Sequence, residues 1–401
     1  MIVELIPSLR FKEFTQEFEL SKLEDIVQKK ISYGIVQAGP HVEGGMPYIK
    51  SKNLNNELRV IDLDRTSTEI AKKYKRSEVG PGDIVFSLRG NIGVSRIVPD
   101  SITVANLTQG TARLSLKAGF SAKYIQEELR TSRIKNRIEA ISKGSTFQEI
   151  SLTDLRTVKV AIPEKAEQQK IANFLASVDT KISQLTEKHR LLKDYKKGVM
   201  QQIFSQKVRF KDDNGNAFPD WKEKVIGDVM TESRIKGNSG DIAKKLTVKI
   251  WGKGVIPKKD DSKGSENTQY YKRKAGQFIY GKLDFLNCAF AIIPDELDGY
   301  ESTLDLPSLD VSSLVNKFFV LEVVKQKRFY KRFGEIADGS RKAKRINVGV
   351  FQKMPITLPS KAEQNKIMAF LDSLDKKTNA VNEQIEQTKL FKKGLLQQMF
   401  V

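Results

Sequence analysis

Two stretches of the chain are closely similar, and they decide its organisation. Residues 162–182 read IPEKAEQQKIANFLASVDTKI, and residues 358–378 read LPSKAEQNKIMAFLDSLDKKT. The similarity resumes further along the chain at the same offset, without a gap in the alignment of the two copies. KGVMQQIF at 197–204 corresponds to KGLLQQMF at 393–400. A repeat of so long a period indicates a duplicated domain and not a short-period solenoid.

Weaker similarities precede each copy and extend the repeat to the whole chain. Residues 9–12 (LRFK) resemble residues 208–211 (VRFK), and residues 18–27 resemble residues 221–230. The sequence therefore predicts two tandem halves, each a variable segment followed by a copy of the repeat. The predicted boundaries are residues 1–160 for the first domain, 161–205 for a central helix, 206–357 for the second domain and 358–401 for a distal helix.

Each copy of the repeat is predicted to form one long helix. Apolar residues recur at alternating steps of four and three, which is typical of a heptad seam. Pro163 and Pro359 precede the two helices, and the pattern Ser360-Lys361-Ala362-Glu363 is that of a capping box. A helix of about 38 residues is roughly 57 Å long and exposes its seam if it is alone, so we expect the two copies to pair as a coiled coil.

Several residues interrupt the seam or the helix. His189, Thr378 and Thr388 stand at seam positions that are apolar in the other copy, where they either set the register or lie at an exposed end. Gly198 and Gly394 each cost a helix ~1 kcal/mol relative to alanine, and they fit either close packing or a bend.

The variable segments mix strand and helix signals, which predicts an α+β fold for each domain. Residues 83–88 (DIVFSL) and 277–280 (QFIY) follow turn residues and read as strands. Helical stretches are expected near residues 122–142 and 312–333.

The charge of the chain indicates a polyanionic partner. Lys and Arg number 69 against 49 Asp and Glu, a net charge of +20, which favours nucleic acid over an ordinary solvated surface. No apolar run approaches the ~20 residues of a membrane span, and residues 1–14 lack the apolar core of a signal peptide. We therefore expect a cytoplasmic protein without a membrane partner.

Few residues are suited to catalysis or metal binding. The chain has one cysteine, Cys288, and two histidines, His41 and His189, which excludes a multi-cysteine or His-rich metal site. Residues 276–282 (GQFIYGK) have the spacing of a phosphate-binding loop, but Leu283 replaces the hydroxyl residue that would bind magnesium, and the middle reads as a strand. Neither a methyltransferase motif nor a convincing nuclease motif is present, so the chain itself is predicted to perform no chemistry and to bind no metal.

Polar loops near the end of each variable segment, together with residues 282–287 (KLDFLN), are the candidate DNA contacts. Glycine allows close approach to a phosphate, and Ser, Thr, Gln, Lys, Arg and Asn donate hydrogen bonds to phosphates and base edges. Ordinary surface loops look similar, and the run QYYKRK at 269–274 fits a strand edge as well as a contact. The candidate DNA-binding residues are Lys143, Ser145, Thr146, Gln148, Lys282, Asn287, Ser340, Arg341, Lys342, Lys344 and Arg345.

The duplicated helix, with KAEQQKI and KAEQNKI each followed closely by Phe-Leu, resembles the repeats of type I restriction-modification specificity subunits. The phrases LRFK at 9–12, PGDIVF at 81–86, GTARL at 110–114 and LDFLN at 283–287 resemble that family too. The similarity extends over essentially the whole chain. One departure is Cys288, where glycine is expected before Ala289-Phe290.

This resemblance implies that the two helices run antiparallel as a spacer between two target-recognition domains, each of which binds one half of a bipartite site in double-stranded DNA. It also implies methyltransferase (M) and restriction (R) subunits as partners. S-adenosylmethionine, and ATP with magnesium, would belong to those partners, with no cofactor in this chain. Two other interpretations are a sequence-tolerant nucleic-acid scaffold, which leaves two dissimilar domains unexplained, and an enzyme acting on DNA alone, which needs the missing motifs.

Overall fold

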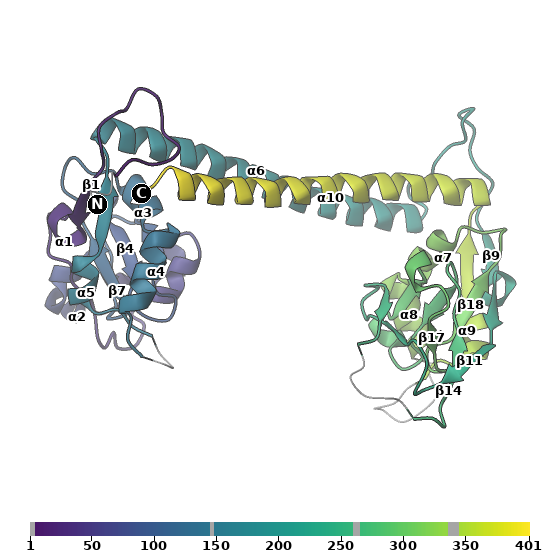
Figure 1. Ribbon diagram of the computed structural model, residues 1–401. Helices are drawn as coiled ribbons and strands as arrows, with labels where there is room; N and C mark the ends of the chain where they lie inside the picture. Colours follow the sequence, from purple (N-terminus) through teal and green to yellow (C-terminus); the bar gives the residue numbers. More distant parts are fainter. Residues whose placement is uncertain (1–4, 145–147, 260–264, 336–344) are drawn as a thin grey trace. The chain divides into compact units, whose positions relative to one another are not determined.

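The computed structural model describes residues 5–144, 148–259, 265–335 and 345–401 (Figure 1). It contains two compact units. Unit 1 comprises Met1–Lys188 with Val381–Val401, and unit 2 comprises His189–Ala380. Each unit mixes helices with small sheets, as the α+β prediction requires.

Unit 1 is built on three small sheets and the helices that cover them. The sheet β5-β4-β7 lies at its centre, beside β3-β2-β6 and the pair β1-β8. The strand expected at 83–88 is β4, whose four residues are all buried, and the helical stretch expected at 122–142 is α3 followed by α4. The strands are β1 Glu19–Lys22, β2 Met46–Ile49, β3 Asp64–Thr66, β4 Ile84–Ser87, β5 Ser95–Ile97, β6 Asn106–Leu107, β7 Thr111–Leu114 and β8 Lys159–Ile162; the helices are α1 Leu23–Ile26, α2 Thr68–Lys73, α3 Ala122–Glu128, α4 Ser132–Ile141 and α5 Leu152–Thr157.

Unit 2 has a four-stranded sheet of order β10-β18-β15-β16, a three-stranded sheet β11-β14-β17, and the pairs β12-β13 and β9-β19. Its core is aromatic, since Phe278 stacks on Phe351 with ring centroids 5.6 Å apart. The predicted strand at 277–280 is β15, and the predicted helical stretch at 312–333 is α7 followed by α8. The strands are β9 Lys222–Val225, β10 Met230–Ser233, β11 Ile235–Ser239, β12 Leu246–Val248, β13 Val255–Pro257, β14 Gln269–Lys272, β15 Phe278–Tyr280, β16 Phe290–Ile292, β17 Glu301–Ser302, β18 Ser308–Val311 and β19 Pro355–Leu358; the helices are α7 Lys317–Val324, α8 Lys327–Gly334 and α9 Val348–Gln352.

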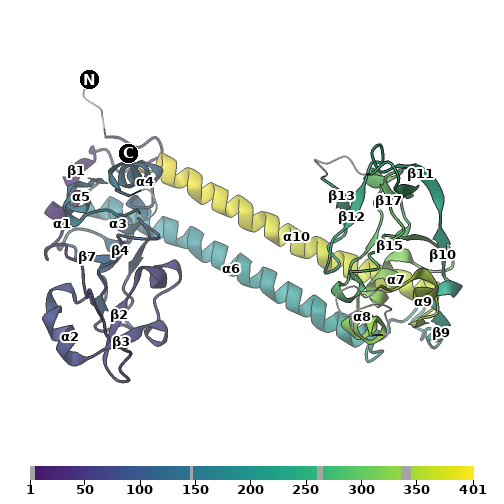
Figure 2. The ribbon, with the colours of Figure 1, turned by 90° about the horizontal axis from the view of Figure 1, so that it is seen from below.

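The two copies of the repeat form the long helices α6, Lys165–Phe204, and α10, Lys361–Gln398. The helices lie side by side and run in opposite directions (Figures 1 and 2), as predicted. The start of α6 and the end of α10 share the core of unit 1, where Leu175 and Leu395 are buried together. The end of α6 and the start of α10 share the core of unit 2, where Ile203 and Leu371 are buried together.

The same two repeat positions meet in both units. Lys392 pairs with Asp179 at 2.7 Å in unit 1, and Lys196 pairs with Asp375 at 2.5 Å in unit 2. Asp375 is the second copy of Asp179, and Lys392 is the second copy of Lys196. The exchange is that of a twofold-related pair, in which position i contacts j and j contacts i.

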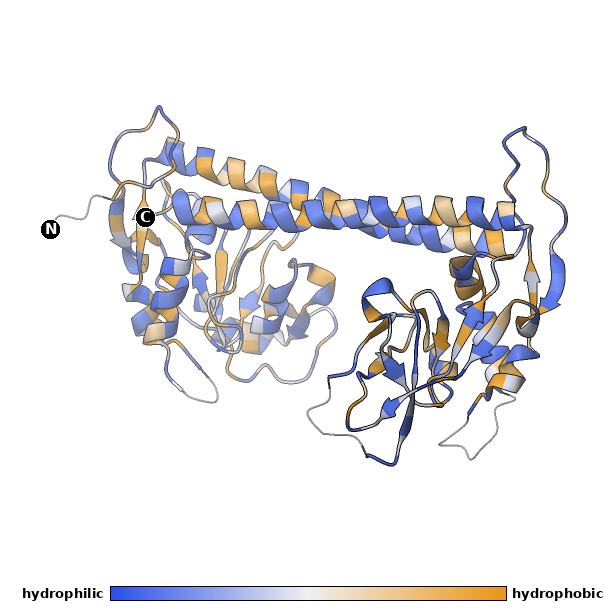
Figure 3. Ribbon diagram, turned by 45° about the vertical axis from the view of Figure 1, so that its right-hand side comes forward, coloured by the Kyte–Doolittle hydropathy of each residue, from blue (hydrophilic) through white to orange (hydrophobic). Residues whose placement is uncertain are grey.

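Hydrophobic and hydrophilic residues alternate along both long helices (Figure 3). Thr378 is buried at its seam position, with its hydroxyl donating to the Leu374 carbonyl, whereas His189 is half-buried. Neither helix breaks at its glycine, and a methyl group added at Gly198 would meet no atom within 4 Å. Close packing against the described residues is therefore not the reason for Gly198.

Candidate DNA interface and the helix junctions

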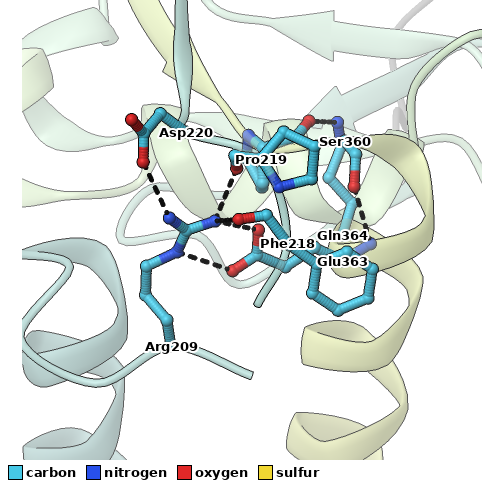
Figure 4. Close-up of polar contacts among 8 residues, drawn as sticks. Arg209, Phe218, Pro219, Asp220, Ser360, Glu363 and Gln364 are labelled. Atoms are coloured by element: carbon cyan, nitrogen blue, oxygen red, sulfur yellow. Dashed lines mark hydrogen bonds and ion pairs between the residues drawn. The ribbon is translucent and has the colours of Figure 1, made fainter. Parts of the chain in front are cut away.

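Each long helix starts at a junction where it is bound by side chains of its own unit. At the junction of unit 2, Arg209 donates from Nη2 to Glu363 Oε2 at 2.8 Å and from Nε to Oε1 at 3.2 Å (Figure 4). The same guanidinium also donates to the carbonyls of Phe218 and Pro219. Glu363 is completely buried, and its hydrogen bonds raise the pKa of Arg209.

The junction of unit 1 repeats this arrangement. Arg10 donates to Glu167 Oε1 at 2.8 Å and to Oε2 at 2.7 Å, and Glu167 is completely buried as well. Paired hydrogen bonds between guanidinium and carboxylate fix the relative orientation of the two groups as well as attracting them. The weak LRFK and VRFK similarity therefore has a physical role, because each Arg binds the Glu of the repeated KAEQ.

The glutamine of KAEQ binds the rest of its domain in both copies. Gln168 donates to the Pro163 carbonyl at 2.9 Å and accepts from the Ser121 amide, at the N-cap of α3. Gln364 donates to the Pro359 carbonyl at 2.9 Å and accepts from the Asn316 amide, at the N-cap of α7. The sequence analysis assigned no role to either glutamine, although the repetition of KAEQ in both copies was a signal that could have identified them.

The capping box expected at the start of α10 forms only in part. The Ser360 hydroxyl accepts from the Glu363 amide at 3.3 Å, which confirms the helix start. The Glu363 side chain does not return to the cap, because it is bound by Arg209.

The candidate DNA loop of unit 1 is described at its two ends, while Ser145 and Thr146 lie outside the described residues. Lys143 is exposed, and its backbone exchanges two 2.9 Å hydrogen bonds with Glu149. Gln148 is exposed too, and it lines a hollow of ≈ 880 Å³. The basic residues of that hollow are Arg96, Arg130, Lys135, Lys389, Lys392 and Lys393, against one acid, Glu139. Burial lowers the pKa of Arg96, and the neighbouring charge of Arg130 lowers it further.

In unit 2 the structure brings Lys282 and Arg345 together around Asp305. Arg345 pairs with Asp305 at 3.4 Å, and the Lys282 amide donates to the Asp305 carbonyl at 2.9 Å. Burial lowers the pKa of the half-buried Lys282. Ser340, Arg341, Lys342 and Lys344 lie outside the described residues.

Asn287 lies at the other end of the turn that begins at Lys282. Its side-chain amide donates to Asp284 at 3.1 Å, and its carbonyl accepts from the Trp251 amide at 2.7 Å. Between these ends, Phe285 is buried in the core.

Two sequence patterns have structural explanations. The phosphate-loop spacing at 276–282 contains the buried strand β15, as expected from its residues. In the run 269–274, Arg273 is 1% exposed and donates to oxygens of Ser233, Ser302, Thr303 and Ser308. Burial lowers the pKa of Arg273 to about 10, and this side chain is part of the protein interior and not of the surface.

One basic surface was missed. Helix α8 buries Phe329 and Tyr330, while Lys327, Arg328, Lys331 and Arg332 are exposed. Four basic residues in six positions were the available signal, and the helical periodicity puts them together on the side away from the core. This helix directly precedes the basic loop at 339–345.

The backbone of Cys288 adopts the conformation that glycine, the residue expected at this position, would favour. Its φ is 54° and its ψ 46°, in the left-handed region, two residues before β16 begins. Gly93 has a φ of 82° two residues before β5 in unit 1. The two turns are therefore equivalent, and the cysteine keeps the geometry of the glycine.

Neither a metal site nor a membrane span is found in the part of the chain that the structure describes. No group of three His, Cys, Asp or Glu residues there is arranged to bind a metal ion. None of the helices in these residues combines the length and the apolar character needed to cross a bilayer.

Known proteins share both the sequence pattern and the fold. Two specificity subunits of type I restriction enzymes are similar in sequence: MjaIX of Methanocaldococcus jannaschii is 26% identical over 47% of this chain and 45% of its own length, and EcoBI of Escherichia coli is 30% identical over 36% and 31%. The chain thus spans less than half the length of these two relatives.

Solved structures match over almost their full length. The S subunit from M. genitalium gives a TM-score of 0.54 at 15% identity over 99% of both chains, and the HsdS subunit from Thermoanaerobacter tengcongensis gives 0.52 at 13% over 96% and 97%. A chain from a study of the assembly of a type I restriction-modification system gives 0.58 at 13% over 96% and 97%. The family model for the type I restriction modification DNA specificity domain matches twice, at residues 15–193 and 220–388. The chain therefore belongs to the family of type I restriction-modification DNA specificity subunits.

Proposed function

We propose that this chain selects the DNA sequence for a type I restriction-modification enzyme. Each unit binds one half-site of a bipartite site in double-stranded DNA, and the helices carry the methyltransferase and restriction subunits. The observation that carries the proposal is the pair of equivalent junctions. The same Arg–Glu and Gln contacts attach two dissimilar domains to two similar helices, so the domains are free to differ in what they bind.

Positive surfaces in both units support DNA binding. The hollow beside Gln148 in unit 1 is lined by basic side chains, and α8 in unit 2 exposes four more. Lys and Arg that neutralise phosphates supply the sequence-independent part of DNA affinity, and base-edge contacts from the loops add the specificity. The residues that would make these contacts are Lys143, Ser145, Thr146 and Gln148 in the first half of the chain, and Lys282, Asn287, Ser340, Arg341, Lys342, Lys344 and Arg345 in the second.

Exposed aromatic residues on the long helices support the binding of protein partners. Tyr195 of α6 is 54% exposed in unit 2, and Phe391 of α10 is 55% exposed in unit 1. These are the same position in the two copies of the repeat. Aromatic residues are enriched at protein interfaces, so the repeat offers two equivalent attachment points for two copies of one partner.

The chemistry is assigned to those partners. Methyltransferase subunits would use S-adenosylmethionine to methylate adenine in the half-sites, and restriction subunits would use ATP with magnesium. The chain would be non-catalytic and would act in the cytoplasm with the DNA.

The experiment is methylome sequencing of cells that express this chain with its methyltransferase partner. We expect methylated adenines in a motif of two short specified parts separated by an unspecified gap. Cells with the methyltransferase but without this chain provide the control. Methylation of adenines regardless of the surrounding sequence would favour a sequence-tolerant scaffold. Methylation of DNA by the purified chain alone with S-adenosylmethionine would overturn the non-catalytic assignment.

A further inference from the structure

A separate two-stranded ribbon in unit 2 has features that the candidate loops do not explain. Strands β12 and β13 pair with each other alone, with Leu246 opposite Pro257 and Val248 opposite Val255 (Figure 2). Leu246, Val248 and Val255 are buried in one small core with Ile279. The ribbon is therefore fixed to the body of the unit along one face, and residues 249–254 form the turn between its two strands.

Trp251 stands in this turn with an unusual backbone. Its φ is 63°, in the left-handed region that non-glycine residues rarely adopt, and Gly252 and Gly254 follow with φ of 63° and 90°. The Trp251 amide donates to the Asn287 carbonyl, and the Gly252 amide to the Cys288 carbonyl, both at 2.7 Å. These hydrogen bonds hold the turn against the Lys282–Cys288 turn, which includes two candidate DNA-binding residues. Left-handed backbone at a non-glycine residue persists where surrounding contacts over-determine it, and it is frequent at functional sites.

The fixed backbone presents a large apolar side chain to solvent. Trp251 is 54% exposed, and its neighbour Ile250 is 39% exposed. The other tryptophan, Trp221, packs against Phe319 with ring centroids 5.8 Å apart. Trp251 therefore has apolar surface that a bound partner can cover.

The charge of the ribbon favours DNA as that partner. Residues 243–259 contain six lysines and no Asp or Glu. Lys249 and Lys253 flank the tryptophan in the turn, both exposed, and no described carboxylate forms an ion pair with either. Lysine is depleted at protein–protein interfaces, whereas it is the usual partner of phosphate.

We propose that the turn at 249–254 is a DNA-contacting element of unit 2, with Trp251 packed against bases and Lys249 and Lys253 placed at phosphates. This inference rests on the proposed function, and it names a residue for the second half-site. A two-stranded ribbon fits the major groove of duplex DNA, where apolar side chains contact the methyl group of thymine at the base edge.

Labelling tests the placement of Trp251 directly. The full chain is made with 5-fluorotryptophan and combined with unlabelled methyltransferase subunits, and the resonance that disappears in Trp251→Phe is assigned to Trp251. Because the chain has only two tryptophans, its ¹⁹F spectrum contains two resonances. We expect the Trp251 resonance to shift when a duplex carrying the methylated motif is added, and to stay unchanged when the methyltransferase is added alone.

Binding measurements test its contribution. Trp251→Ala should weaken binding of the motif duplex about tenfold without changing the salt dependence, since an apolar contact with base edges releases no counterion. Lys249→Ala with Lys253→Ala should reduce the log–log salt slope by about 0.9 for each phosphate that is no longer neutralised. Phe318→Ala is the matched control, because Phe318 is also an aromatic residue of unit 2 and is 48% exposed.

The outcomes separate this inference from the proposed function. If the wild-type complex binds no duplex in preference to another, the proposed function fails. If it binds the motif duplex while Trp251→Ala binds equally well and the Trp251 resonance does not move, the inference is wrong. A shift caused by the methyltransferase alone would overturn it in favour of a protein contact.

Discussion

The carboxylate of Glu363 is completely buried, and both of its oxygens are bound by the guanidinium of Arg209, at 2.8 and 3.2 Å. A buried carboxylate without a partner is costly, because neither water nor a cation then compensates its charge. The start of helix α10 is thus held by this ion pair. Removing Arg209 alone would leave the charge of Glu363 buried without a partner.

Arg209→Met should therefore destabilise unit 2 by about 3 kcal/mol, whereas the double variant with Glu363→Gln should recover part of that stability. Urea unfolding of the single and double variants measures the coupling energy. The equivalent variants Arg10→Met and Glu167→Gln provide the comparison in unit 1. Additive effects, with a coupling energy near zero, would show that the ion pair does not fasten the helix.

The left-handed backbone of Cys288 predicts that glycine is preferred over alanine at this position. Cys288→Gly should be more stable than Cys288→Ala by about 1 kcal/mol, since both remove the sulfur and only the alanine keeps a Cβ. Gly198→Ala should instead raise the free energy of unfolding by up to about 1 kcal/mol, because that glycine is helical and the added methyl group meets no described atom. Thermal unfolding of the three variants tests both signs, and an alanine as stable as glycine at 288 would contradict the strain.

Modularity follows from the equivalent junctions. Replacing residues 206–357 with the matching segment of a relative, while keeping 163–204 and 359–400, should change one half-site and preserve the other, because base contacts are local. The donor segment should retain the counterpart of Arg209, so that the junction still forms. Methylated adenines are mapped for parent and chimera; if both half-sites change together, the model of one half-site per unit is wrong.

The helix pair is predicted to set the gap between the half-sites. Inserting four residues near Ser183 adds about one turn, or ~6 Å, and should lengthen the gap by at most ~2 base pairs with the half-sites unchanged. Methylome sequencing measures the gap. An unaltered gap from a complex that still assembles would contradict this prediction, and native mass spectrometry of the complex checks assembly.

The basic loop at 339–345 is predicted to lie against phosphate. Replacing Arg341, Lys342, Lys344 and Arg345 with alanine should weaken binding to all duplexes and lower the log–log salt slope by about 0.9 for each phosphate left without its basic partner. Lys376→Ala on α10 is the control, since that side chain is exposed and pairs with Asp372. An unchanged salt slope in the assembled complex would exclude these residues from the phosphate contacts.

The heptad periodicity of the repeat predicted the long helices, and the apolar seam that each helix would expose alone predicted their pairing. The strand and helix signals of the variable segments predicted the α+β character of the domains, because such signals are local in sequence. The Arg209–Glu363 ion pair was not predicted, since the two residues are far apart in the chain and the VRFK similarity is short. Arg273 stands between two lysines in the sequence, Lys272 and Lys274, and only tertiary packing determines that its side chain is buried among serine oxygens. The exposure of Trp251 likewise depends on its left-handed backbone, which the residue type at position 251 does not predict.

The order in which the parts of this protein can fold during synthesis follows from the far end of α10. Phe400 stacks on Tyr124 with ring centroids 5.2 Å apart, and Leu395 and Met399 lie in the same core of unit 1. Unit 2 draws its residues from one continuous stretch, whereas unit 1 lacks this part of its core until Phe400 has left the ribosome. Domains usually mature from the N-terminus onward as they are translated. Here the first domain to be translated is the last to be completed, and until then it exposes an apolar surface that a chaperone can recognise.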